Sequence, residues 1–185
     1  MTFKLLVFYR WIMKSILQQI KSAELICEIY TNRENTDSFS VGYVLSIDND
    51  YAIFQLYDPD GLFDGFRVMT IESIYTLKTN TNYLYKLQKK MVEVELSKDF
   101  SYNDNLLINF LNYVQQANEL CQISVCDSDY DDSVGFVKSI FEDKLFVNQI
   151  NPKGKSDGEA YIMLPCVTSV DVCNQECEAI KKRIK

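Results

Sequence analysis

Apolar side chains recur with the 3.6-residue period of a helix just ahead of two strand-rich stretches. In the first, residues 12–22 place Ile12, Ile16, Leu17 and Ile20 on one stripe. In the second, Asp104 can cap a helix through Gln116, whose inward positions are Leu106, Leu107, Phe110, Leu111 and Val114. Both patterns predict an amphipathic helix that packs one face onto a sheet.

Each helix is followed by five short segments of strand-like composition. The polar tripeptide Asp48-Asn49-Asp50 marks a hairpin turn between two of them. The predicted strands of the first half are 25–31, 39–47, 51–57, 66–70 and 73–78, with a closing helix over 82–90. Those of the second half are 120–126, 133–140, 144–150, 159–163 and 166–171, with a final helix that starts at Cys173 or Asn174.

The two halves resemble each other in sequence. At a fixed offset of 93, residues 41–77 lie over residues 134–170, and ten of the 37 positions are identical. Upstream, ELICEI (Glu24–Ile29) matches ELCQI (Glu119–Ile123) after a small change of length. We interpret the chain as a tandem duplication, with a first repeat over residues 1–98 and a second over 99–185.

Five strands of this size have exposed edges, and closing the sheet on itself removes them. The predicted fold class is therefore α+β, mainly β. It consists of two tandem five-stranded antiparallel small barrels, each preceded and followed by a helix.

The longest shared motif is DPDGLFDG (Asp58–Gly65) against NPKGKSDG (Asn151–Gly158). Asp58, Asp60 and Asp64 suggest a calcium site, but the second copy has Asn151 and Lys153 at the first two positions, and the distal Glu of a calcium loop is missing. Both copies keep residues that favour turns, which predicts a structural turn rather than a metal site. These residues are Pro59, Gly61, Asp64 and Gly65, with Pro152, Gly154, Asp157 and Gly158.

Other candidate chemistry is sparse. The chain contains no His, which removes the commonest general base and the usual nitrogen ligand of zinc. Its six Cys include no C-x-x-C pair, so buried free thiols in a reducing cytosol are expected. The acidic run Asp127, Asp129, Asp131 and Asp132 is interpreted as a solvated turn, with an enzymatic or metal-binding use as the alternative. We expect no catalytic residues, no cofactor and no resident metal.

Gly42-Tyr43-Val44-Leu45-Ser46-Ile47-Asp48 resembles the pattern of Sm-like and SH3-like small barrels, which have a glycine in the second strand and an aspartate six residues later. The resemblance implies the barrel architecture and, for Sm-like proteins, RNA binding. The RNA-binding positions differ, since Tyr51-Ala52 stands where an Asn is usual and Ile71–Ile74 where Arg-Gly is usual. A nucleic-acid-binding regulator of Sm-like type is therefore the alternative function.

Charge separates along the chain. Residues 24–78 carry a net charge of −7 and residues 119–178 a net charge of −8, whereas residues 1–23 carry +4. Acidic barrels would repel a phosphate backbone. We therefore expect a non-catalytic binding or regulatory protein that engages a basic protein partner. We expect a cytoplasmic location without membrane contact, the alternative being a basic amphipathic first helix on a membrane surface. Self-association stays open.

Overall fold

The computed structural model describes residues 3–35, 37–91, 95–100, 102, 104–126 and 133–184, with side chains from residue 8 onward. The protein is mainly β, with ten strands and four α-helices in these ranges. The chain divides into two compact units. The first comprises Met1–Asp64 and Met69–Leu106, and the second comprises Gly65–Val68 and Leu107–Lys185.

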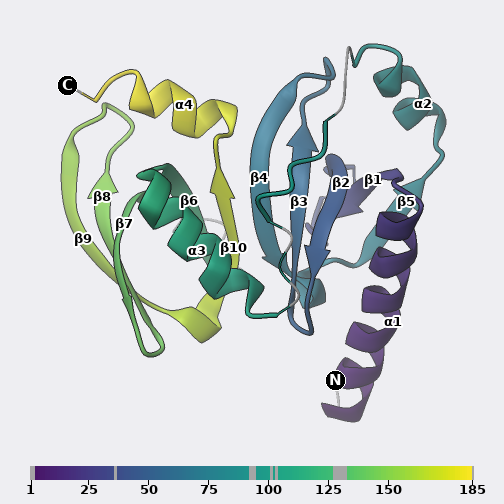
Figure 1. Cartoon of the computed structure of the whole chain (residues 1–185), viewed down its shortest axis with the longest axis horizontal. Helices are drawn as coiled ribbons and strands as arrows, with labels where there is room; N and C mark the ends of the chain where they lie inside the picture. Colours follow the sequence, from purple (N-terminus) through teal and green to yellow (C-terminus); the bar gives the residue numbers. More distant parts are fainter. Residues whose placement is uncertain are drawn as a thin grey trace. The chain divides into compact units, whose positions relative to one another are not determined.

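The elements of the first unit follow one another as a helix, five strands and a helix (Figure 1). A single turn of 3-10 helix at Ile71–Ser73 separates the fourth strand from the fifth. The elements are α1 (Phe3–Ser22), β1 (Ile26–Tyr30), β2 (Ser40–Ile47), β3 (Tyr51–Tyr57), β4 (Phe63–Thr70), β5 (Thr76–Thr79) and α2 (Asn82–Gln88).

The second unit has the same order of elements, again with a 3-10 turn, at Leu164–Cys166, ahead of the last strand. The elements are α3 (Leu106–Ala117), β6 (Leu120–Val125), β7 (Ser133–Phe141), β8 (Lys144–Ile150), β9 (Ser156–Met163), β10 (Val167–Val172) and α4 (Gln175–Lys181). In both units the strand that follows the first helix pairs with the second and the fifth strands of its own unit.

The strands form an open sheet, so the prediction of two closed five-stranded barrels is wrong. The hydrogen-bonded order is β5-β1-β2-β3-β4-β10-β6-β7-β8-β9, and among the described residues β5 and β9 each have one neighbour. Closure was inferred from the need to protect strand edges. The structure protects the edge of β4 differently, because residues Gly65–Val68 group with the second unit, where β4 is the neighbour of β10.

A layer of apolar side chains covers each face of the first unit's strands. Met13, Leu17 and Ile20 of α1 pack with buried side chains of β1–β4, among them Phe54. Leu84 and Leu87 of α2 pack on the other side in a second cluster. This explains why every residue of β1 is buried although alternate side chains point to opposite faces. In the second unit α4 contributes Cys177 and Ile180 to a cluster with Leu120.

Two glycines stand at equivalent places where strands approach too closely for a side chain. A Cβ at Gly42 would collide with the carbonyl oxygen of Gln55, and a Cβ at Gly135 with the carbonyl oxygen of Asn148. Each glycine lies opposite a buried cysteine, in the pairs Cys27–Gly42 and Cys121–Gly135. The thiol of each cysteine lies within hydrogen-bonding distance of the glycine carbonyl oxygen, at 3.5 and 3.3 Å.

No helix in the described part of the chain combines the length and the apolar character needed to cross a bilayer.

Candidate functional site

The repeated turn motif begins with a side chain that organises its own backbone. Asp58 Oδ1 accepts hydrogen bonds from the amides of Asp60 and Leu62, both at 2.9 Å. Asn151 Oδ1 does the same in the second copy, for Lys153 at 3.0 Å and Lys155 at 3.2 Å. An amide oxygen therefore replaces a carboxylate without loss of these bonds, which shows that the position serves the turn in both copies.

The closing helix of each unit is tied to this turn through a proline carbonyl. Lys90 Nζ donates to the oxygen of Pro59 at 2.9 Å, and Arg183 Nη1 donates to the oxygen of Pro152 at 2.6 Å. Gly61 and Gly154 adopt positive φ values of 82° and 76°, close to the same two helix ends. The turn therefore positions the end of a helix.

The three aspartates of the first motif have different surroundings. Asp60 is 83% exposed and pairs with Lys90 at 3.4 Å, whereas Asp58 bonds its own turn. The Asp-Gly pairs were predicted as part of the structural turn, but they belong to strands. Asp64 and Gly65 lie in β4, and Asp157 and Gly158 lie in β9. The acidic run Asp127, Asp129, Asp131 and Asp132 lies outside the described residues.

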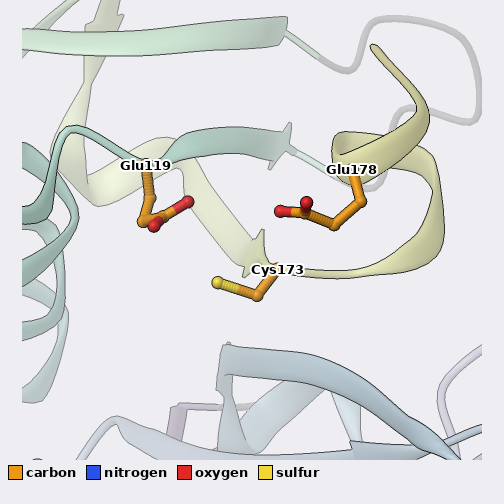
Figure 2. Close-up of side chains that lie close together, drawn as sticks. All are labelled: Glu119, Cys173 and Glu178. Carbon is orange, nitrogen blue, oxygen red and sulfur yellow. The ribbon is translucent and has the colours of Figure 1, made fainter. Parts of the chain in front are cut away.

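A cluster that sequence reasoning did not find lies in the second unit. Glu119, Cys173 and Glu178 each bring one potential ligand atom within 4.8 Å of the other two, the one such group among the described residues. Figure 2 shows the two carboxylates and the sulfur turned toward a common space. They come from three places: the residue before β6, the residue after β10 and helix α4.

Lys181 supplies the positive charge of this cluster. Its Nζ donates to Glu119 Oε2 at 2.6 Å and to Glu178 Oε1 at 3.1 Å. The first of these bonds raises the pKa of the lysine, which therefore stays protonated. An ammonium group that bridges two carboxylates provides what a divalent cation would provide, so the cluster is satisfied as a network of ion pairs.

The thiols near this cluster are poor nucleophiles. Burial raises the pKa of Cys173 to about 11, with Glu119 as the next cause, and burial also raises the pKa of Cys177 to about 12. Since the thiolate is the reactive form, neither residue has the lowered pKa of a catalytic cysteine. Cys173 precedes the N-cap Asn174 of α4 and has a φ of 57°, so it lies outside the helix that contains Cys177.

A buried carboxylate in the first unit also has its hydrogen-bond donors within the fold. Glu28 is 4% exposed and accepts hydrogen bonds from the hydroxyls of Tyr30, at 2.7 Å, and of Thr81. The Thr81 hydroxyl oxygen also accepts from Leu84 N at the start of α2. This network therefore anchors α2.

The acidic tips of the two equivalent hairpins differ in what surrounds them. In the first unit, the β2–β3 tip is bound by α1: Arg10 donates to Asp50 and to Glu72, the latter at 3.0 Å. Lys14 of the same helix donates to Asn49 Oδ1 at 2.7 Å. The hairpin tip of the first unit is therefore held by two cations from its own helix.

Among the described residues, the β7–β8 tip receives no cation from the equivalent helix, α3. It consists of Phe141, Glu142 and Asp143, which are all exposed, Phe141 by 61%. The ends of α1 and α3 carry equivalent backbone hydrogen bonds, since Leu25 N donates to the oxygen of Ile20 and Glu119 N donates to the oxygen of Val114. These bonds align α1 with α3 at an offset of 94 residues. Helix α3 contains no Lys or Arg, so it offers none of the cations that α1 supplies.

Comparisons with known proteins assign the chain to no family. No protein-family model matches the chain, and no curated protein matches it. A crystal structure of MrkH from K. pneumonia aligns over 94% of this chain and 89% of that one, at 10% identity and a TM-score of 0.20. That similarity is too low to indicate a shared fold.

Proposed function

We propose that the protein is a non-catalytic binding protein that engages a basic protein partner. The proposed contact is the exposed tip of the β7–β8 hairpin, formed by Phe141, Glu142 and Asp143 and called the second hairpin tip below. The observation that carries the proposal is the contrast with the first unit, where the equivalent tip binds Arg10 and Lys14 of α1. The partner would bring to the second tip the cations that α3 lacks.

The partner chemistry follows from the same contrast. Helix α1 reaches the first tip with cations one turn apart, next to apolar side chains that enter the core. An amphipathic basic helix of another protein would match the second tip in the same way, with Phe141 as its apolar contact. Charge complementarity of this kind speeds encounter and selects the partner.

Ion pairing supports a protein partner over a nucleic acid. The basic residues Arg10, Arg67, Lys90, Lys138 and Lys181 all pair with carboxylates of the chain itself. Nucleic-acid affinity rests largely on cations that neutralise phosphates, and these five are already engaged. The six cysteines form no disulfide, which supports a reducing, cytoplasmic location as part of the proposal.

The proposal is tested by affinity recovery from a lysate of the native cell at low and high salt. The tagged wild-type chain is compared with the double variant E142K/D143K, and E34K/D37K is the matched control, because it makes the same charge change at exposed positions of the first unit. We expect a basic protein that the wild type and the control retain at low salt and that E142K/D143K loses. Equal recovery by all three chains, or recovery of no basic protein, would overturn the proposal.

A further inference from the structure

The two units repeat their strand pairing residue by residue. Cys27 lies opposite Thr79 in β1 and β5, and Cys121 lies opposite Val172 in β6 and β10. The register shift between Val44 and Ser46 recurs between Val137 and Ser139. Residues of β4 and β5 therefore correspond to residues of β9 and β10 at an offset of 93, and the surroundings of equivalent strands can be compared directly.

The strand order gives β4 a neighbour that β9 lacks. In the second unit, the segment Gly65–Val68 of β4 neighbours β10. Arg67 Nε donates to Asp171 Oδ1 at 2.6 Å, and this carboxylate side chain is 6% exposed. A Cβ at Gly65 would collide with the carbonyl oxygen of Val172 and lie 2.7 Å from Asn174 N. The segment Gly65–Val68 is thus closely covered by β10.

The equivalent edges on the outside of the sheet are open. Strand β9 corresponds to β4 but neighbours only β8 among the described strands, and a Cβ at Gly158 would meet nothing within 4 Å. Tyr161 and Met163 of β9 are 69% and 48% exposed. Strand β5 corresponds to β10 and neighbours only β1 in the same description. An eight-residue edge strand with exposed apolar side chains is a template for pairing with another chain.

We propose that the protein assembles head to tail, with β9 of one copy paired to β5 of a second copy. This contact repeats between molecules the pairing that Gly65–Val68 makes with β10 inside one chain. In the equivalent arrangement Ala160 takes the place of Arg67, and Lys78 of the second copy takes the place of Asp171. The interface is heterologous, so it extends into an open chain or closes into a ring.

Charge favours this pairing over the pairing of β9 with itself. Strand β9 carries Asp157 and Glu159 and no basic residue, and Glu159 pairs with Lys138 of β7. Strand β5 carries Lys78, which donates to the Tyr30 hydroxyl, and no acidic residue. Two antiparallel β9 strands would bring acids against acids, which is destabilising for directly opposed positions. Pairing of β9 with β5 brings an acidic strand to a basic one.

The outer face of α1 is the second surface that this assembly explains. Phe8, Trp11, Ile12 and Ile16 are exposed on one side of the helix, Trp11 by 66% and both isoleucines by 38%. At the offset of 94, Ile12 and Ile16 correspond to Leu106 and Phe110 of α3, which are fully buried. The same helix positions are thus covered in one repeat and uncovered in the other, and we assign their cover to the second copy.

The experiment follows the emission of Trp11, the single tryptophan of the chain, in a dilution series with parallel sedimentation velocity. Two substitutions of Ala160 form a matched pair. A160R places a cation next to Lys78 of the second copy, and A160E places an anion there. We expect association of the wild type with rising concentration and a blue shift of the Trp11 emission. We also expect a dissociation constant on the order of tenfold higher for A160R and equal or lower for A160E.

Two further measurements separate this interface from others. The variant I12Q/I16Q, altered only at exposed positions, should weaken association while its unfolding midpoint stays that of the wild type. A160R keeps its β5 edge, so mixing it with the wild type should shorten the assemblies by blocking their growth. A wild type that stays monomeric with constant Trp11 emission would overturn the proposal. So would a closed dimer that responds equally to A160R and A160E.

Discussion

The pair Gly65 and Gly158 allows the cost of a close strand contact to be separated from the cost of backbone strain. Both glycines have nearly the same positive φ, 87° and 89°. An Ala at either position would therefore carry a similar strain, about 1–3 kcal/mol for a residue held in such a region. The lower entropy of an unfolded chain with Ala in place of Gly is also common to both variants.

The surroundings of the two positions differ. A Cβ at Gly65 collides with the carbonyl oxygen of Val172, while a Cβ at Gly158 has open space. Overpacking of a close contact adds about 1–3 kcal/mol, so Gly65→Ala should destabilise the chain by that much more than Gly158→Ala does. The corresponding difference in Tm is roughly 2–12 °C for a chain of this size.

Urea unfolding followed by far-UV circular dichroism measures this difference, at concentrations low enough to keep the chains monomeric. Gly65→Ala should have the clearly lower unfolding midpoint. If the two variants lose the same free energy to within about 0.5 kcal/mol, then β10 does not approach β4 at Gly65, and the comparison of strand edges fails with it.

Three further predictions concern the helix caps, the thiol of Cys173 and the repeated turn. Thr81→Ala and Asn174→Ala each remove the side-chain acceptor at the start of α2 and α4 and should each cost at least about 1 kcal/mol in urea unfolding. Thr81→Ala should cost more, because it also removes the hydroxyl that donates to buried Glu28. No loss in either variant would contradict the cap geometry. Folding raises the pKa of Cys173 from 9.0 to about 11, so the unfolded chain loses this proton first and stability should fall between about pH 9 and 11. Cys173→Ser should make the urea midpoint depend less on pH over that interval. An unchanged dependence would show that the Cys173 thiol is not the group with the raised pKa. Millimolar Ca²⁺ should leave the Tm unchanged, because Asp58 accepts hydrogen bonds from amides of its own turn and Asp60 pairs with Lys90. A rise in Tm with Ca²⁺ that Asp60→Asn removes would contradict this.

Much of the local structure could be predicted from the sequence, because helices, hairpins and turns depend on residues near one another. The apolar stripe through Leu17 and Ile20 marked α1, and both side chains enter the core. The prediction of closed barrels was wrong because sheet closure depends on segments that are distant in sequence. Closure of a sheet depends on which strand reaches the free edge of β4, and periodicity within β4 carries no information about β10.

The cluster around Lys181 shows the same limit. Glu119 and Lys181 are 62 positions apart, and the turn of the chain at Cys173 brings the thiol to them. The one local signal was Glu178 and Lys181 three positions apart, a spacing that pairs charges on a helix. Single cysteines scattered along a chain gave no indication that one of them would join two carboxylates and an ammonium group.

Hydrogen exchange of the backbone amides, followed by mass spectrometry at low and high protein concentration, tests most directly whether equivalent edges are covered in one repeat and open in the other. In dilute protein, we expect slow exchange in Gly65–Val68 and fast exchange in the equivalent segment Gly158–Tyr161. Exchange in Gly158–Tyr161 and in β5 should both slow as the concentration rises. Equal exchange of the two segments in dilute protein, or a β9 edge that remains unprotected at every concentration, would contradict this expectation.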